Sequence, residues 1–207
     1  MAFDEVLSPV LQTDLRSKYH PVLVAYQNNE WIREQMALLE SHGDLDHAVR
    51  VAFLAAELAK HVEMNDDEIL IIAKAGLLHD LGKLQIPPEI FKKVQLTEKE
   101  RALVDEHVRA GFELVKERFP FVAKIMVAHH EFQARRYPRK NDRDPVGTRL
   151  RELQRLLAIA DQTDALLSAR SYKKRWPIYK VREYLNDLFD DHHLIDFSIA
   201  KRISIVD

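Results

Sequence analysis

The sequence predicts an all-α protein. Its 207 residues include five glycines and eight prolines, too few for a loop-rich all-β fold. Leu, Ala, Glu, Lys and Arg are abundant and favour helices. No segment alternates apolar and polar residues with the period that predicts a half-buried strand. Hydrophobic residues make up 46% of the chain and charged residues 31%, a balance that predicts a globular fold rather than a disordered chain.

The N-terminal part predicts helices that pack beside a larger domain. Residues 3–41 read as two helices broken near His20-Pro21, because proline disfavours helix in the residue before it. We assign residues 1–41 to an N-terminal helical extension that packs on the core, and residues 42–207 to the main domain. The same helices can instead pair two chains, so a homo-oligomer is an open alternative.

The first half of the main domain predicts two helices. Apolar residues recur on one face of residues 46–61, as in an amphipathic helix. Asn65 or Asp66 can cap the next helix, which is rich in Ile and Leu. That helix should run to His79-Asp80 and stop at Gly82.

The second half predicts four more helices and one loop. Thr97 and Glu100 match a capping box, in which each side chain accepts from a backbone amide of the other residue. The helix that they open should end near Arg118, ahead of a proline. The later elements are predicted as a helix at 121–131, a basic loop at 133–145, and helices at 148–169 and 177–190.

Composition and charge exclude several classes of protein. The net charge is −2 at pH 7, which gives no electrostatic case for binding DNA or RNA. No run approaches the roughly 18 apolar residues of a membrane span, and the first residues lack the basic start of a signal peptide. The absence of cysteine excludes disulfides and thiolate metal sites. These features lead us to expect a cytoplasmic protein.

Several His and Asp residues fall among apolar residues, where a polar side chain needs a partner. His107 shares a predicted helical face with Leu103 and Leu114, and Asp161 shares one with Leu157. These residues can satisfy one another by hydrogen bonding, but a shared cation offsets several buried charges at once. Imidazole and carboxylate without thiolate suit Fe, Mn, Zn or Co. Two ions about 3.5–4 Å apart would activate water and hold a phosphoryl group.

The order of these residues resembles a known superfamily. His47, His79-Asp80 and Asp161 follow the order H…HD…D, which resembles the HD superfamily of metal-dependent phosphohydrolases. Four blocks over roughly residues 44–200 resemble its HD-GYP subfamily: LLHDLGKLQIPPEI (77–90), EHVRAGFELV (106–115), AHHE (128–131) and ADQTDALLSARSYKK (160–174). That subfamily hydrolyses cyclic dinucleotides, chiefly cyclic di-GMP. The resemblance implies an HD-domain helical bundle that acts on a cyclic dinucleotide or a related phosphate ester.

The resemblance also implies a metal site and its residues. It implies two divalent metal ions, Fe or Mn foremost, with Zn, Co or Ni as alternatives. The implied ligands are His47, His79, Asp80, His107, His129, His130 and Asp161. Asp80 would bridge both ions, and Lys83 would lie beside the bridging hydroxide and neutralise phosphate charge. Arg170 and Lys173 match basic positions that hold the phosphates of the ligand.

Two departures from the subfamily bear on its chemistry. Some members bind a third metal through a Glu four residues before the first His, and Gly43 stands there, which favours two metals. The loop that ends in Tyr137-Pro138 lacks the glycines of the subfamily motif and carries Arg135 and Arg136. Glycine permits a close backbone approach to a ligand. We therefore expect weak cyclic di-GMP hydrolysis beside activity on a smaller phosphate ester.

Other functions stay open at this point. The chain can be a different HD nucleotide phosphohydrolase, a non-catalytic metal-bound module that senses a ligand, or an iron-dependent oxygenase on the same scaffold. Five further histidines are assigned to turns, the surface or helix ends, with a position near the site as the alternative for His42: His20, His42, His61, His192 and His193.

Overall fold

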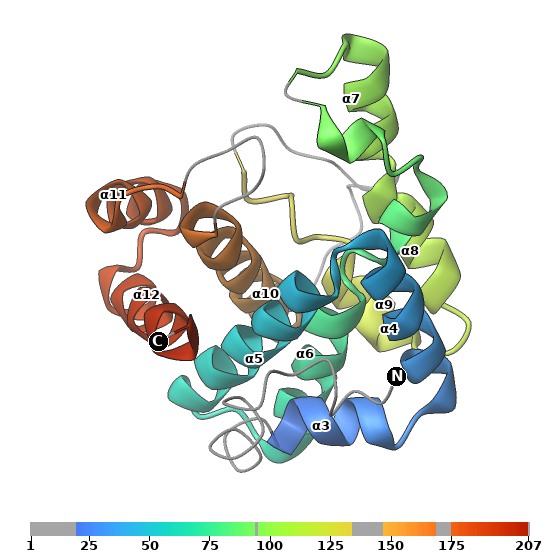
Figure 1. The fold of residues 1–207 in the computed structure, drawn as a ribbon. Helices are drawn as coiled ribbons and strands as arrows, with labels where there is room; N and C mark the ends of the chain where they lie inside the picture. The colour runs from blue at the N-terminus through green and yellow to red at the C-terminus, as the bar shows by residue number, and fades with distance from the viewer. Residues whose placement is uncertain (1–19, 94, 134–146, 169–174, 207) are drawn as a thin grey trace.

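The computed structural model describes residues 20–93, 95–133, 147–168 and 175–206. Within these ranges the chain forms helices and turns and no strand, which confirms the all-α prediction (Figure 1). Arg170, Lys173 and most of the predicted loop at 133–145 lie outside the described residues, as does the chain before His20.

The N-terminal helices differ from the prediction in where they break. Helix α3 spans His20–Gln27, with Pro21 in its first turn, where a missing N–H leaves no bond unmade. Helix α4 spans Glu30–His42, and Asn29 caps it by accepting from the amide of Ile32 at 3.1 Å. The single helix that we predicted after His20 is therefore two helices, because Asn29 is a strong N-cap residue.

Both N-terminal helices pack on the main body. Their apolar side chains, Val22, Ala25, Ile32, Met36 and Leu39, are buried in the same hydrophobic core as those of the later helices. The boundary at residues 41 and 42 stays a prediction.

Helices α5 (Leu45–His61) and α6 (Asp66–Leu78) form as predicted and pack closely against each other. Asn65 caps α6 in a reciprocal capping box with Glu68. The close approach depends on Gly76, since a Cβ there would lie 2.4 Å from the Cα of Ala52. Two short 3₁₀ helices, η1 (Leu81–Gln85) and η2 (Ile90–Lys92), follow α6.

The next helices are shorter than predicted. Thr97 forms the predicted capping box with Glu100. The helix that it opens, α7 (Glu98–Asp105), ends well before the predicted Arg118, and α8 (His107–Val115) follows after a break at Glu106. Helix α9 (Pro120–Met126) ends before the predicted residue 131. At each break a histidine Nδ1 donates to a backbone carbonyl three residues earlier, a side-chain bond that competes with the helical pattern.

The C-terminal part adds three helices. Helices α10 (Thr148–Leu167) and α11 (Ile178–Phe189) agree with the prediction, whereas α12 (His192–Val206) was not predicted. Helix α10 is buried along most of its length and packs on α5, while α11 and α12 lie on its outer side (Figure 1). None of the described helices combines the length and the apolar character needed to cross a membrane.

Candidate metal centre

The seven predicted ligands come from five separate parts of the fold, and the structure brings them together. His47 lies on the first turns of α5, His79 and Asp80 follow α6, and Asp161 lies on α10. The remaining three are at the start of α8 and in the turn after α9: His107, His129 and His130. All are buried except His130, which is partly exposed.

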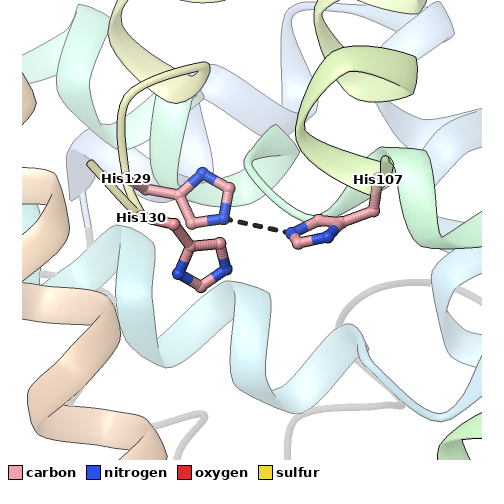
Figure 2. A group of neighbouring side chains, drawn as sticks. All are labelled: His107, His129 and His130. Atoms are coloured by element: carbon pink, nitrogen blue, oxygen red, sulfur yellow. Dashed lines mark hydrogen bonds between the residues drawn. The ribbon is translucent and has the colours of Figure 1, made fainter. Parts of the chain in front are cut away.

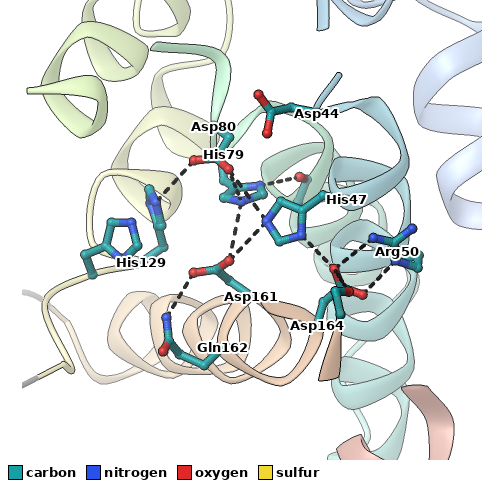
Figure 3. A network of polar contacts seen from close by, with 12 residues as sticks. Asp44, His47, Arg50, His79, Asp80, His129, Asp161, Gln162 and Asp164 are labelled. Atoms are coloured by element: carbon teal, nitrogen blue, oxygen red, sulfur yellow. Dashed lines mark hydrogen bonds and ion pairs between the residues drawn. The ribbon is translucent and has the colours of Figure 1, made fainter. Parts of the chain in front are cut away.

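These residues form two groups that can each hold a metal ion. In the first, ligand atoms of His47, His79 and Asp80 lie within 4.8 Å of one another (Figure 3). Asp161 joins this group, because its Oδ1 lies 3.2 Å from Nε2 of His47 and 3.7 Å from Nε2 of His79. The second group consists of histidines alone, again with ligand atoms within 4.8 Å: His107, His129 and His130 (Figure 2).

Asp80 stands between the two groups. Its Oδ2 lies 3.3 Å from Nε2 of His79 and 3.6 Å from Nε2 of His47. Its Oδ1 lies 3.3 Å from Nε2 of His107 and 3.9 Å from Nε2 of His129. The two carboxylate oxygens therefore face different groups of histidines, as a bridging ligand requires.

Backbone carbonyls fix the orientation of three of the histidine rings. Nδ1 of His79 donates to the carbonyl of Gly76 at 2.7 Å. Nδ1 of His107 donates to Val104 at 2.5 Å, and Nδ1 of His129 donates to Met126 at 2.6 Å. A proton held on Nδ1 leaves Nε2 of the neutral ring as a lone pair that faces the centre, the form that binds a metal.

Three of the Nε2 atoms that face the centre have surroundings that suit a cation. Among the described residues, the buried Nε2 of His79 has no hydrogen-bond partner. Nε2 of His107 lies 3.3 Å from Nε2 of His129, although both rings donate through Nδ1 (Figure 2). Burial, and then the nearby His79, lowers the pKa of His129 to about 3, so this ring is neutral. Two nitrogens that share one ion at about 2.1 Å are about 3.4 Å apart at a tetrahedral angle. The donor set fits a cation.

His47 lies between two carboxylates. Its Nε2 faces Asp161, and its Nδ1 lies 2.7 Å from Oδ2 of Asp164 (Figure 3). Burial opposes protonation, but the hydrogen bonds with Asp161 and Asp164 raise the pKa of His47 to about 9. Burial also opposes ionisation of Asp161, yet the hydrogen bond with His47 holds the pKa of that carboxyl well below its usual range. A metal ion would take the place of the proton between the two side chains.

Lys83 borders the first group. Its Nζ donates to Oδ2 of Asp80 at 2.5 Å and to Oδ1 of Asp44 at 3.5 Å. Asp44 in turn accepts from Nδ1 of His42 at 2.7 Å. The side chain of His42 is only 8% exposed and packs edge-on against Phe91, so our assignment of this histidine to the surface is wrong.

Several residues of the site were not predicted from the sequence. Asp44 lies beside Lys83, and Asp164 lies behind His47 with two arginines, Arg50 and Arg202. Asp164 had a sequence signal, because it stands three residues after Asp161 in the same apolar helix and so shares its face. The arginines had none.

Known phosphodiesterases are similar to part of this sequence. The cyclic di-GMP phosphodiesterase response regulator RpfG of Xanthomonas campestris is 37% identical over 142 residues, 66% of this chain and 36% of its own. The 3'3'-cGAMP-specific phosphodiesterase 2 of Vibrio cholerae is 37% identical over 145 residues, 67% of this chain and 27% of its own. This chain thus spans about a third of the length of these relatives.

A solved structure is similar to this chain in fold. The HD domain of the L. monocytogenes phosphodiesterase PgpH, solved in complex with cyclic-di-AMP, superposes with a TM-score of 0.59 at 18% identity. The superposition covers 84% of this chain and 95% of that one. A model of the HD domain matches residues 31–196. The chain therefore belongs to the HD-domain family.

Proposed function

We propose that this chain is a metal-dependent phosphodiesterase that hydrolyses a cyclic dinucleotide or a related phosphate ester. One observation carries the proposal: the two oxygens of Asp80 face two separate groups of histidine nitrogens. A carboxylate in this position can join two ions into one site. The names of the relatives, which describe phosphodiesterases of cyclic di-GMP and 3'3'-cGAMP, support the substrate class.

Each group of side chains would hold one divalent ion. His47, His79 and Asp161 would hold the first with Oδ2 of Asp80. The second would be held by Oδ1 of Asp80 and three histidines: His107, His129 and His130. Nitrogen and carboxylate donors without thiolate favour Fe or Mn, with Zn, Co or Ni as alternatives. When bound, such a pair lowers the pKa of a coordinated water and stabilises charge on a phosphoryl group.

The protein supplies order and charge around that centre. Backbone carbonyls hold the rings of His79, His107 and His129, so their donor nitrogens need no reorganisation when a ligand binds. Lys83 places a buried ammonium beside Asp80, where it can neutralise a phosphate oxygen of the substrate. Arg170 and Lys173 would hold phosphates of the ligand, as the resemblance to the HD-GYP subfamily implies.

Hydrolysis by metal-loaded protein tests the proposal. Protein loaded with Fe or Mn without oxygen should cleave at least one of cyclic di-GMP, 3'3'-cGAMP and cyclic di-AMP, as seen by chromatography of the products. Asp80→Ala should abolish this activity because both groups lose a ligand. The matched control is Asp46→Ala, directly before His47 in the sequence but exposed to solvent, which should keep wild-type turnover. A wild-type protein that carries metal and cleaves none of these compounds or their linear forms would contradict the proposal.

A further inference from the structure

Asp164 gathers an unusual number of hydrogen bonds directly behind the metal centre. Its Oδ2 accepts from Nδ1 of His47 at 2.7 Å and from Nη2 of Arg50 at 3.2 Å (Figure 3). Its Oδ1 accepts from Nε of Arg50 at 2.7 Å and from Nε of Arg202. Ser168 also donates to Oδ2, at 3.3 Å, so both oxygens are fully used.

This carboxylate is buried together with His47 and Arg202, while Arg50 is partly exposed. Asp164 is 0% exposed, so it cannot contact a substrate, and Arg202 is 6% exposed. Buried charges are maintained only where opposite charges and hydrogen bonds compensate them. The two guanidinium groups hold the carboxylate in one orientation, and one of its lone pairs is aimed at the His47 ring.

The connection reaches a helix of which the family match includes only the first residues. Arg202 lies on α12, beyond residue 196 where that match ends. A second polar contact joins the same two helices, because the hydroxyl of Thr163 on α10 lies 2.9 Å from that of Ser198 on α12. Helix α12 is thus joined to α10 behind the first metal group, on the side of His47 that faces away from Asp80 and Asp161.

We propose that Asp164 is a positioning residue that orients His47 for the first metal ion, and that Arg202 of α12 holds Asp164 in place. The inference rests on the proposed metal centre. A carboxylate that accepts from the outer nitrogen of a histidine ligand fixes the ring and makes its inner nitrogen a stronger donor. The other three ordered rings use backbone carbonyls for this task, so His47 alone among them depends on a side chain.

This arrangement predicts a defect confined to one of two ions. In calorimetric titration of the metal-free chain with Mn²⁺, Asp164→Asn should weaken one binding event by about 10- to 100-fold and leave the other unchanged. A general loss of structure would weaken both. Arg202→Gln should weaken the same event by a smaller factor, and it keeps the test available if Asp164→Asn fails to fold.

The chain offers a matched control on the adjacent residue. Lys201 also joins α12 to α5, through an ion pair with Glu57 at 2.9 Å, but it touches no residue of the metal groups. Lys201→Gln should leave both binding events unchanged. Equal weakening of both events by Arg202→Gln, or no weakening by Arg202→Gln and Asp164→Asn, would overturn the inference. A wild-type chain that binds no Mn²⁺ would instead contradict the metal centre itself.

Discussion

Replacing Gly82 by alanine tests how the fold sets the distance between the two metal groups. Gly82 lies in η1, two residues after Asp80, and packs directly on the first turn of α8. A Cβ at this position would lie 1.9 Å from the carbonyl oxygen of His107 and 2.5 Å from the amide nitrogen of Gly111. To restore a separation of about 3 Å, the shortest that such atoms normally show, α8 must retreat by about 1 Å.

This displacement of α8 should affect both the stability of the fold and the binding of the second ion. Overpacking of this kind costs about 1–3 kcal/mol, which for a chain of this size lowers Tm by about 2–12 °C. Metal ligands must lie within about 0.2 Å of their proper distances, so moving His107 by about 1 Å should weaken the second ion at least about tenfold. The first ion, whose ligands do not lie on α8, should bind nearly as in wild type.

Thermal unfolding and Mn²⁺ titration measure the two effects. Gly147→Ala is the control, because a Cβ there meets nothing within 4 Å and the residue precedes α10 at the surface. If Gly82→Ala has the same Tm as Gly147→Ala and binds both ions with wild-type affinity, the close packing of η1 on α8 does not set the geometry of the site.

Three further predictions follow from single side chains. Lys83→Ala should retain both ions yet lose most turnover, because Lys83 contacts Asp80 without being a ligand; wild-type turnover would show that its role is wrong. Asp44→Asn should slow turnover about fivefold, from a loss of about 1 kcal/mol of ion pairing with Lys83, with unchanged metal content; Asp46→Asn is the control. Glu57→Gln tests a pH dependence. Burial opposes ionisation of Glu57, but the hydrogen bond with Lys201 lowers its pKa below the usual 4.5. Its contribution to stability, up to about 1 kcal/mol, is therefore complete above that pH and is lost as the pH falls through the lower folded value. Urea unfolding should show a wild-type advantage that shrinks at acid pH, and a constant difference would contradict the assignment.

Local patterns predicted the helices that local interactions determine. The caps at Asn65 and Thr97 form as expected, because each needs only residues three positions away. The breaks at Glu106 and after Met126 were missed, since apolar spacing continues through them. The hydrogen bonds of the His107 and His129 rings with backbone carbonyls at these breaks cannot be read from that spacing. The predicted face of His107 was also partly wrong: Leu103 is 40% exposed and Leu114 is 37% exposed.

Long-range contacts set the limit of the prediction for the site. The ligand histidines stand in recognisable motifs, and the structure brings all seven implied ligands together. Arg50 and Arg202 meet Asp164 across 114 and 38 residues of chain, and no spacing in the sequence relates them. Helix α12 was missed for a related reason, since its buried residues face several neighbours and leave no single apolar stripe.

Metal content measured by elemental analysis tests the central claim most directly. After anaerobic loading with Fe or Mn and removal of excess ion, the full chain should carry about two ions, as a dinuclear site requires. Asp80→Ala should carry far less, because both groups of side chains lose the ligand that they share. A wild-type chain with no bound metal, or an Asp80→Ala chain that binds as much as wild type, would contradict the account.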